Sequence, residues 1–402
     1  MRRLDDREPL INSSRRIQRR EFFRTSGRAT LGLALLPLSA CSRSTDKPTS
    51  DRSAPFSTLV ADLEKQIPDW MVEHSTPALS IALISDAQIA WRRAFGVKDF
   101  VSRQPVDDDT VFEAGSVSKT VFAYAVLKLC EKGVLDLDAP LTEYTSERLL
   151  DDPRLDLITT RRVLCHTTGL PNWRSDKDPM KIGFTPGERW SYSGEGYAYL
   201  QSVVTQLTGH VDPEHCANFE QNLKVCATDI DSYMKTNLLV PLGMTSSGYV
   251  WTDAYDRVMA LPHDDKGKTF SRRTTSAEAA RYASSGDLHT TATEYAKFLI
   301  EVIDPKPADA FRLGAAIRAE MLRPQVQVMD KLWWGLGWAI ERLDAGDIIT
   351  HSGDNPGYKA FTAASVDRKS GYIILTNSDT GFEVIRKIVQ SDGMQRFLPV
   401  TL

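Results

Sequence analysis

Three short motifs in this chain carry side chains that could cooperate in acyl transfer. They are Ser116-Val117-Ser118-Lys119, Tyr192-Ser193-Gly194 and His351-Ser352-Gly353, in that order along the sequence. A serine hydroxyl is a weak nucleophile at neutral pH, so it needs a base within hydrogen-bond reach and donors for the developing oxyanion. Lys119 and Tyr192 are the candidate bases. We expect burial to lower the pKa of the lysine, and a neighbouring cation to lower that of the tyrosine.

The Ser-x-x-Lys pattern by itself is weak, because it also occurs at Ser44 to Lys47 and at Ser232 to Lys235. Only Ser116 opens a strongly apolar segment with helical spacing after an extended run and a glycine. Residues three apart lie on the same face of a helix, so Lys119 is expected to reach the Ser116 hydroxyl. Ser116 is therefore the predicted nucleophile.

Tyr192 lies in a turn-rich segment that leads into a helix predicted to begin near Tyr197. Loops of this kind often present side chains to clefts. Other catalytic patterns are missing from the sequence. There is no Gly-x-Ser-x-Gly elbow, no His-Glu-x-x-His pair and no clustered Cys/His ligand set; His210 and His215 are five residues apart beside a predicted loop. We therefore predict neither a metal nor a cofactor.

The motifs together resemble the serine β-lactamase and penicillin-binding-protein superfamily, particularly the branch of class C β-lactamases, DD-peptidases and related esterases. Residues 164–171, 186–193 and 355–358 add to the resemblance, which covers about residues 56–395. It implies Ser116 as the acylated nucleophile, with Lys119 and Tyr192 as proton-transfer groups. It implies that the strand carrying His351, Ser352 and Gly353 lines the substrate. The implied oxyanion hole consists of the backbone NH groups of Ser116 and Asp354.

Two positions depart from the β-lactamase pattern. Gly194 replaces an asparagine whose amide contacts the acyl side chain of the substrate, and His351 replaces a lysine. A histidine is largely neutral at pH 7 and anchors a carboxylate weakly. We therefore favour an esterase or a D-amino-acid peptidase acting on a small-molecule or peptide substrate. A penicillin-binding sensor with little turnover and a class C-like β-lactamase remain alternatives.

The amino terminus predicts export. Arg19 and Arg20 precede an apolar run over residues 29–38, which is too short to span a bilayer. The paired arginines resemble a twin-arginine signal, and Leu38-Ser39-Ala40-Cys41 resembles a lipoprotein cleavage site. We predict a signal peptide over residues 1–40, a tether over 41–55 and a periplasmic protein held to the membrane by a lipid on Cys41. An ordinary basic amino terminus is the alternative.

Export would change the net charge of the chain and would bring its cysteines into an oxidising compartment. Residues 1–40 contain nine arginines and four acidic residues, so their removal takes the formal net charge from -4 to -9. Such a chain is not expected to bind nucleic acid. Cys216 and Cys226 bracket a polar segment and could form a local disulfide, whereas Cys130 and Cys165 have apolar surroundings and are predicted core residues. A monomer is expected.

Strand patterns occur at both ends of the chain, and helical periodicity dominates between them. Residues 78–84 and 88–95 read as a hairpin. Further strands are expected over 334–340, 348–351, 358–366 and 371–377, with a closing helix over 382–396. We predict an α/β (α+β) fold, in which an antiparallel sheet flanked by helices is built from both ends of the chain. The sheet domain would comprise 56–136 and 290–402, and an inserted all-α domain 137–289, with a substrate cleft between them.

Overall fold

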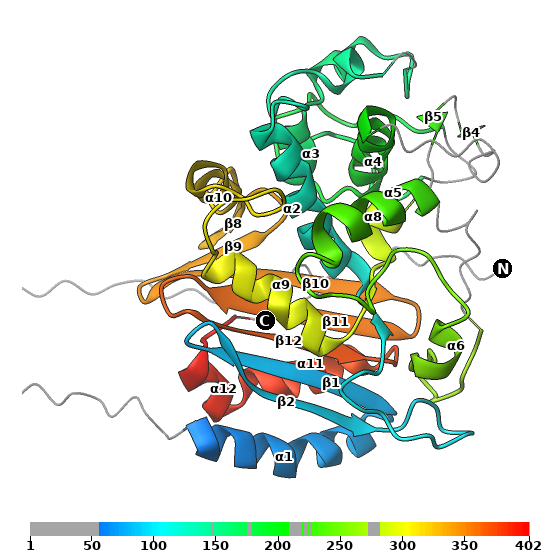
Figure 1. Ribbon diagram of the computed structural model, residues 1–402, viewed down its shortest axis with the longest axis vertical. Coiled ribbons are helices and arrows are strands. Elements are labelled where there is room, and N and C mark those ends of the chain that lie inside the picture. The colour runs from blue at the N-terminus through cyan, green and yellow to red at the C-terminus, as the bar shows by residue number, and fades with distance from the viewer. Residues whose placement is uncertain are drawn as a thin grey trace, which may run out of the picture.

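The computed structural model describes residues 56–145, 148–174, 179–208, 219–220, 223–224, 227–271 and 282–401. Its centre is an eight-stranded antiparallel sheet in the order β2-β1-β12-β11-β10-β9-β8-β7 (Figure 1). The first two strands come from the start of the described chain and the other six from its end, which confirms the predicted fold class. The strands are β1 (Ala78–Ser85), β2 (Gln88–Gly96), β7 (Val326–Met329), β8 (Leu332–Trp334), β9 (Ala339–Leu343), β10 (Gly346–Asn355), β11 (Tyr358–Ser365) and β12 (Ser370–Thr376).

The predicted hairpin at the start of the sheet is confirmed. Strands β1 and β2 pair in antiparallel register from Ala78 with Gly96 to Ser85 with Gln88. Their connection, Asp86-Ala87, has positive φ angles of 51° and 55°. Two-residue turns of this kind match the twist of the flanking strands.

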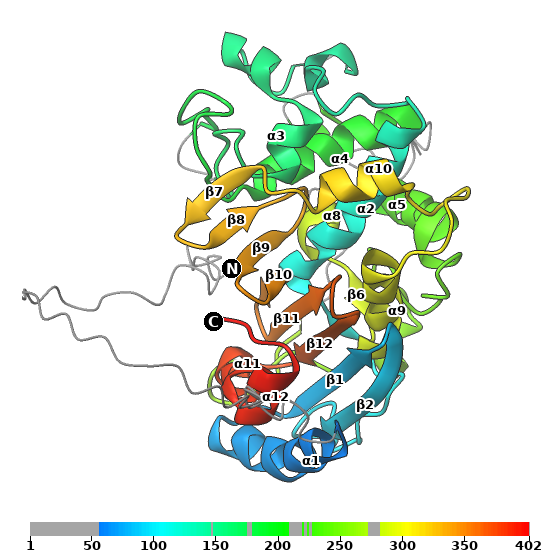
Figure 2. The ribbon, with the colours of Figure 1, turned by 90° about the vertical axis from the view of Figure 1, so that its left-hand side faces the viewer.

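The sheet is covered by helices on both faces (Figures 1 and 2). In β1, Leu79, Ile81 and Leu83 belong to one apolar cluster with α1, α11 and α12, whereas Ala78, Ala82 and Ile84 face the main cluster, which includes α2 and α9. Successive side chains of a strand point to opposite faces, so two covers explain why nearly all of β1 is buried. The covering helices are α1 (Phe56–Glu73), α2 (Ser118–Glu131), α9 (Ala292–Ile303), α11 (Gly381–Gln390) and α12 (Asp392–Phe397).

The middle of the chain contributes mainly helices, most of which stand in the upper part of Figure 1, whereas α6 lies lower, beside the sheet. They are α3 (Thr160–Leu164), α4 (Gly194–Thr208), α5 (Ala227–Met234), α6 (Tyr255–Val258) and α8 (Ala283–Gly286), and α10 (Ala315–Met321) follows later in the chain. Two minor sheets pair β3 (Phe112–Glu113) with β6 (His289–Thr290), and β4 (Phe219–Glu220) with β5 (Leu223–Lys224). The division of the chain at residues 136 and 290 stays a prediction.

Two predicted elements are interrupted. The strand expected over 334–340 is split, because the chain turns between Trp334 and Ala339 with Gly337 at a φ of 90°. A Cβ at Gly337 would lie 2.6 Å from the Cβ of Ala123, so the glycine allows this turn to pack against α2. The helix expected over 382–396 is broken at Ser391, whose hydroxyl caps the start of α12.

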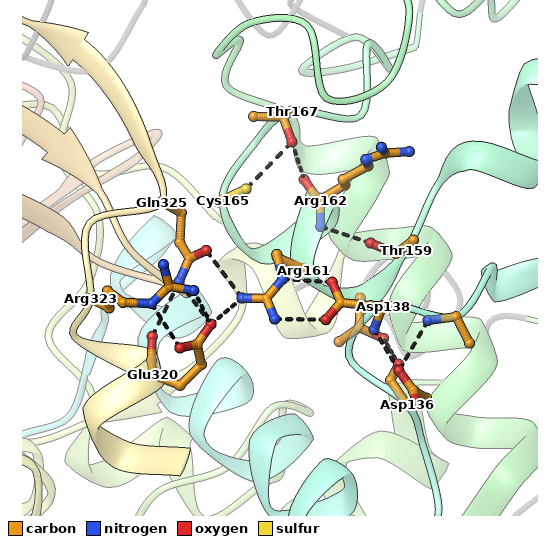
Figure 3. A network of polar contacts seen from close by, with 12 residues as sticks. Asp136, Asp138, Thr159, Arg161, Arg162, Cys165, Thr167, Glu320, Arg323 and Gln325 are labelled. Atoms are coloured by element: carbon orange, nitrogen blue, oxygen red, sulfur yellow. Dashed lines mark hydrogen bonds and ion pairs between the residues drawn. The ribbon is translucent and has the colours of Figure 1, made fainter. Parts of the chain in front are cut away.

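A polar network joins the middle of the chain to α10 and to the start of β7 (Figure 3). Arg161 donates from Nε and Nη2 to the two carboxylate oxygens of Asp138 at 2.6 and 2.7 Å. Its Nη1 donates to Glu320 and, at 3.1 Å, to Gln325. The guanidinium of Arg161 therefore links the loop of Asp138 to α10 and to the residue before β7. Its planar fork matches the two oxygens of a carboxylate.

Several predictions fall outside the described residues. They concern the signal peptide and the tether, Ser44, Cys41, the pair Cys216 and Cys226, and His210 and His215. Cys165 is buried as predicted, and Cys130 is half-buried; both are free thiols. Within the part of the chain that the structure describes, every helix is too short or too polar to traverse a bilayer.

Candidate active site

Ser116 is placed where α2 begins, against strand β10. Gly115, at a φ of 53°, starts the 3₁₀ turn Gly115–Val117 that leads into α2. A Cβ at Gly115 would lie only 2.8 Å from the backbone nitrogen of Asp354. Glycine is therefore required for this close approach. Ser116 is half-buried, whereas its neighbours on both sides are buried, so its side chain faces the accessible part of the site.

Lys119 lies beside Ser116, one turn along the helix. Its ammonium nitrogen Nζ is 3.1 Å from Ser116 Oγ and 2.7 Å from the backbone oxygen of Ser285. The side chain is completely buried. Burial lowers the pKa of Lys119 to about 7, against a smaller opposing effect of Asp287. A large share of this lysine is thus neutral at pH 7 and able to accept a proton.

The ring of Tyr192 lies close to the Lys119 side-chain nitrogen. Lys119 Nζ lies 5.0 Å from the centre of the tyrosine ring. The phenol oxygen is buried and makes no hydrogen bond of ordinary geometry, although Ser116 is near enough to oppose the effect of burial on its pKa. Burial raises the pKa of Tyr192. The expectation of a lowered pKa is therefore wrong, because burial without a charged partner disfavours the phenolate.

The strand β10 brings the third motif to Ser116. It pairs with β9 only as far as Thr350, whereas it pairs with β11 up to Asn355. No other described strand pairs with residues 351–355, and Ala114 and Gly115 pack against Gly353 and Asp354 instead. A Cβ at Gly353 would lie 2.0 Å from the backbone oxygen of Ala114, so this position also requires glycine.

The backbone nitrogen of Asp354 lies beside Gly115, which is compatible with the oxyanion hole that the resemblance implies. The carboxylate of Asp354 forms an ion pair with Lys359, its partner on β11, at 2.9 Å. Lys359 is buried and also donates to Asp379 at 2.9 Å. This lysine therefore fixes the end of β10.

His351 is buried rather than presented to solvent. Its Nδ1 is 2.7 Å from the backbone oxygen of Ser352. A carbonyl only accepts hydrogen bonds, so Nδ1 carries the proton and Nε2, which has no partner among the described residues, is an acceptor. Burial and the charge of Lys119 lower the pKa of His351 to about 3. The ring is neutral and offers no positive charge to a substrate carboxylate.

His166 supports the tyrosine. Its ring lies 4.1 Å from that of Tyr192, and its Nδ1 accepts a hydrogen bond from the Ser193 backbone at 3.1 Å. Burial, with a further effect of Lys119, holds the pKa of His166 well below its usual range. Trp334 packs edge-on against both histidines. His166 thus packs against Tyr192 and holds the backbone of the following residue.

The sequence analysis missed two contributors to this site, Ser285 and Asp287, and it noted Asn355 only as part of the resemblance. The backbone oxygen of Ser285 holds Lys119, and Asp287 raises its pKa. Asn355 donates from Nδ2 to Glu113 at 2.7 Å and to the Gly286 backbone at 3.0 Å, which ties β10 to the chain before Ser116. A buried run of small residues at 283–286 was the available signal, since such runs permit close approach of backbones.

The second Ser-x-x-Lys pattern has a different geometry. Ser232 is exposed on α5, and Lys235 forms an ion pair with Asp231 at 2.8 Å. The lysine is thus engaged by a carboxylate. This pattern lies on the surface of the helical part and makes a suitable control.

One cavity of about 530 Å³ lies beyond the turn between β10 and β11. None of its lining residues belongs to the three motifs. They are Trp251, Asp256, Leu261, Pro262, Thr269, Phe270, Ser271 and Tyr358. The geometry of the motif residues, and not this cavity, therefore defines the candidate site.

Comparison with known proteins shows similarity in both sequence and fold. A family model described as Beta-lactamase matches residues 58–390. The chain belongs to the Beta-lactamase family. It is accordingly a member of the serine β-lactamase and penicillin-binding-protein superfamily of serine hydrolases, as the motifs predicted.

The relatives carry different names. The chain is 22% identical to Penicillin-binding protein 4* of Bacillus subtilis over 75% of its own length and 68% of the relative. It is 29% identical to Esterase EstB of Burkholderia gladioli over 46% of its length and half of the esterase. D-alanine Carboxypeptidase AmpC from Burkholderia cenocepacia has the same fold, with a TM-score of 0.68, 19% identity, and coverage of 85% of this chain and 99% of that one.

Proposed function

We propose that this protein hydrolyses carboxylic esters through an acyl-enzyme on Ser116. The hydroxyl oxygen attacks the ester carbonyl while neutral Lys119 takes its proton. The backbone NH groups of Ser116 and Asp354 receive the negative charge, and protonated Lys119 returns the proton to the leaving alcohol as the carbon–oxygen bond breaks. Water then hydrolyses the acyl-enzyme by the reverse sequence of proton transfers.

One observation carries this proposal: a completely buried lysine with a pKa of about 7 lies 3.1 Å from the serine oxygen. A general base is most effective when its pKa is near the working pH. Tyr192, whose pKa burial raises, is better suited to stay protonated and to donate a hydrogen bond. We assign the base to Lys119 and the donor to Tyr192.

An ester is preferred to a peptide or a β-lactam because of two features. Neutral, buried His351 offers no positive charge to the carboxylate of a D-alanyl peptide or a penicillin. Gly194 supplies no amide to the acyl side chain. The relative named as an esterase adds support for this choice.

Hydrolysis of p-nitrophenyl acetate by the purified protein tests the proposal. We expect Ser116→Ala to abolish turnover, and Lys119→Ala to lower kcat by roughly 10²- to 10⁴-fold, as for loss of a general base. Ser232→Ala is the matched control, because it removes a serine from the same short pattern on the surface. Turnover that survives Ser116→Ala, or that disappears in Ser232→Ala, would contradict the assignment.

A penicillin-binding protein with little turnover is the second candidate, favoured by the relative of that name. A fluorescent penicillin separates the two. A persistent label on Ser116 without ester turnover would favour the binding protein, and rapid ester turnover the hydrolase. Rapid loss of the penicillin label together with release of opened lactam would instead indicate a β-lactamase.

We also propose that the mature protein is an exported bacterial lipoprotein, which lies in the periplasm and is anchored to the membrane by a lipid on Cys41. The order of basic, apolar and cleavage-site residues at 19–41 supports this proposal. Expression of the full chain in a Gram-negative host, followed by fractionation, is the test. Cys41→Ser should move the protein from the membrane fraction to the soluble one. An unprocessed amino terminus found by mass spectrometry would contradict the proposal.

A further inference from the structure

The space beside Gly194 is occupied by an indole. A Cβ at Gly194 would lie 2.6 Å from Cζ3 of Trp173 and 2.7 Å from the backbone oxygen of Asn172. A side chain at residue 194 therefore cannot coexist with this position of Trp173. The amide that the β-lactamase pattern has here is thus replaced by an aromatic surface that comes from another loop.

The indole is held in place by a buried ionic cluster. Glu195 is completely buried and accepts hydrogen bonds from the backbone nitrogen of Arg174 at 3.0 Å and from its Nε at 2.9 Å. A further ion pair with Arg174 Nη2 measures 2.7 Å. The hydroxyl of Tyr282 donates to the same carboxylate at 2.5 Å, and its ring packs edge-on against Trp173 at 4.8 Å. Two chain segments thus converge on Glu195 and fix the tryptophan between them.

The same indole borders the catalytic groups. Lys119 Nζ is 5.9 Å from the centre of the Trp173 ring and 3.1 Å from Ser116 Oγ. Trp173 is only half-buried, so part of its surface stays accessible. An acyl group bonded to Ser116 therefore extends within reach of an apolar aromatic surface.

We propose that Trp173 determines specificity by forming an apolar wall of the acyl subsite, which accepts flat or aliphatic acyl groups that lack an amide next to the carbonyl. This inference rests on the proposed hydrolysis at Ser116. The face of an indole stacks on an aryl group, but it cannot pair with the N–H and C=O of an amide. Esters with an aryl group in the acyl part gain binding energy from contact with the indole. In esters of N-acylated amino acids, the amide loses its hydrogen bonds to water and finds no partner on the indole face.

Three p-nitrophenyl esters test this inference: the acetate, the phenylacetate and the ester of N-acetylglycine. The readout is kcat/KM of each ester relative to that of the acetate. Trp173→Ala should lower the relative value for phenylacetate roughly tenfold, the size expected for loss of an aromatic contact. It should raise the relative value for the amide-bearing ester. Trp173→Phe should retain the phenylacetate preference within about threefold, because an aromatic face remains.

Two controls separate specificity from stability. Trp91→Ala removes another half-buried tryptophan, on β2, which packs in the cluster on the opposite face of the sheet, and it should leave all three ratios unchanged. Trp173→Leu keeps apolar volume if the alanine variant fails to fold, and it should show the same loss for phenylacetate. Ratios that stay within twofold in every folded Trp173 variant overturn the inference alone. Absence of Ser116-dependent hydrolysis of every ester overturns the proposed function as well.

Discussion

Replacing Lys119 by methionine should stabilise the protein while it destroys the proposed base. Methionine keeps much of the length of the side chain, but it removes a group whose charge is unfavourable in the interior. The completely buried Lys119 has its pKa lowered from 10.5 to about 7, so the folded state binds this proton much less readily than the unfolded chain does. The burial that allows Lys119 to accept a proton therefore lowers the stability of the folded protein.

The sign and size of the effect follow from that shift. Below pH 7 both states bind the proton, and the penalty of the folded state is complete. Between pH 7 and 10.5 only the unfolded chain binds it, so the penalty falls as pH rises. At about 1.4 kcal/mol per pKa unit, the penalty at pH 7 is on the order of 4 kcal/mol. Between pH 6 and pH 9 it should decline by roughly 3 kcal/mol.

Urea unfolding of the wild type and of Lys119→Met at pH 6, 7.5 and 9 provides the assay. The variant leaves the backbone oxygen of Ser285 without its partner, which costs about 1–3 kcal/mol at every pH. The pH dependence of the difference in unfolding free energy is therefore the decisive quantity. A difference that is constant from pH 6 to pH 9 would refute the buried, weakly basic lysine.

Three further predictions concern activity and stability. The kcat/KM for p-nitrophenyl acetate should fall with decreasing pH with a midpoint near 7, because Lys119 must be neutral to accept a proton; a profile flat from pH 5.5 to 8.5 would contradict this. Gly353→Ala should lower kcat roughly 10²- to 10³-fold. The new Cβ would lie 2.0 Å from the Ala114 backbone oxygen, so the strand that carries the oxyanion donor must shift. Stopped-flow or steady-state kinetics would measure the loss of kcat, and a melting curve would show whether the variant is folded. Arg161→Met should cost about 1–3 kcal/mol in urea unfolding, whereas Arg148→Met, which breaks an exposed ion pair, should change the unfolding free energy little. Equal losses in the two variants would contradict a structural role of the network.

The strands of the sheet were largely predictable because their apolar runs are local signals. The hairpin of β1 and β2 and the positions of β11 and β12 agree with the sequence analysis within a residue or two. The breaks at Gly337 and Ser391 were not predicted, because apolar periodicity continues through both. In each case a contact or cap formed by the folded chain decides where an element ends.

The candidate site was predictable where spacing within one element sufficed. Ser116 and Lys119 share a helix turn, so their hydrogen bond follows from the α-helical repeat. The approach of Tyr192 to the same lysine was predicted from the chemistry of the two side chains and from the resemblance, not from spacing within one element, and the structure brings the two together. Trp173 and Ser285 could not be found in this way, because neither residue belongs to a motif.

The sequence by itself determined the nucleophile helix, the strand-rich ends and the family of this protein, since each depends on residue types at short spacing. Tertiary structure alone decided the protonation of the site. Burial makes Lys119 a weak base near pH 7, keeps Tyr192 protonated and leaves His351 neutral. The physical reason is that desolvation depends on how many atoms from distant segments surround a group, and no local pattern records that number.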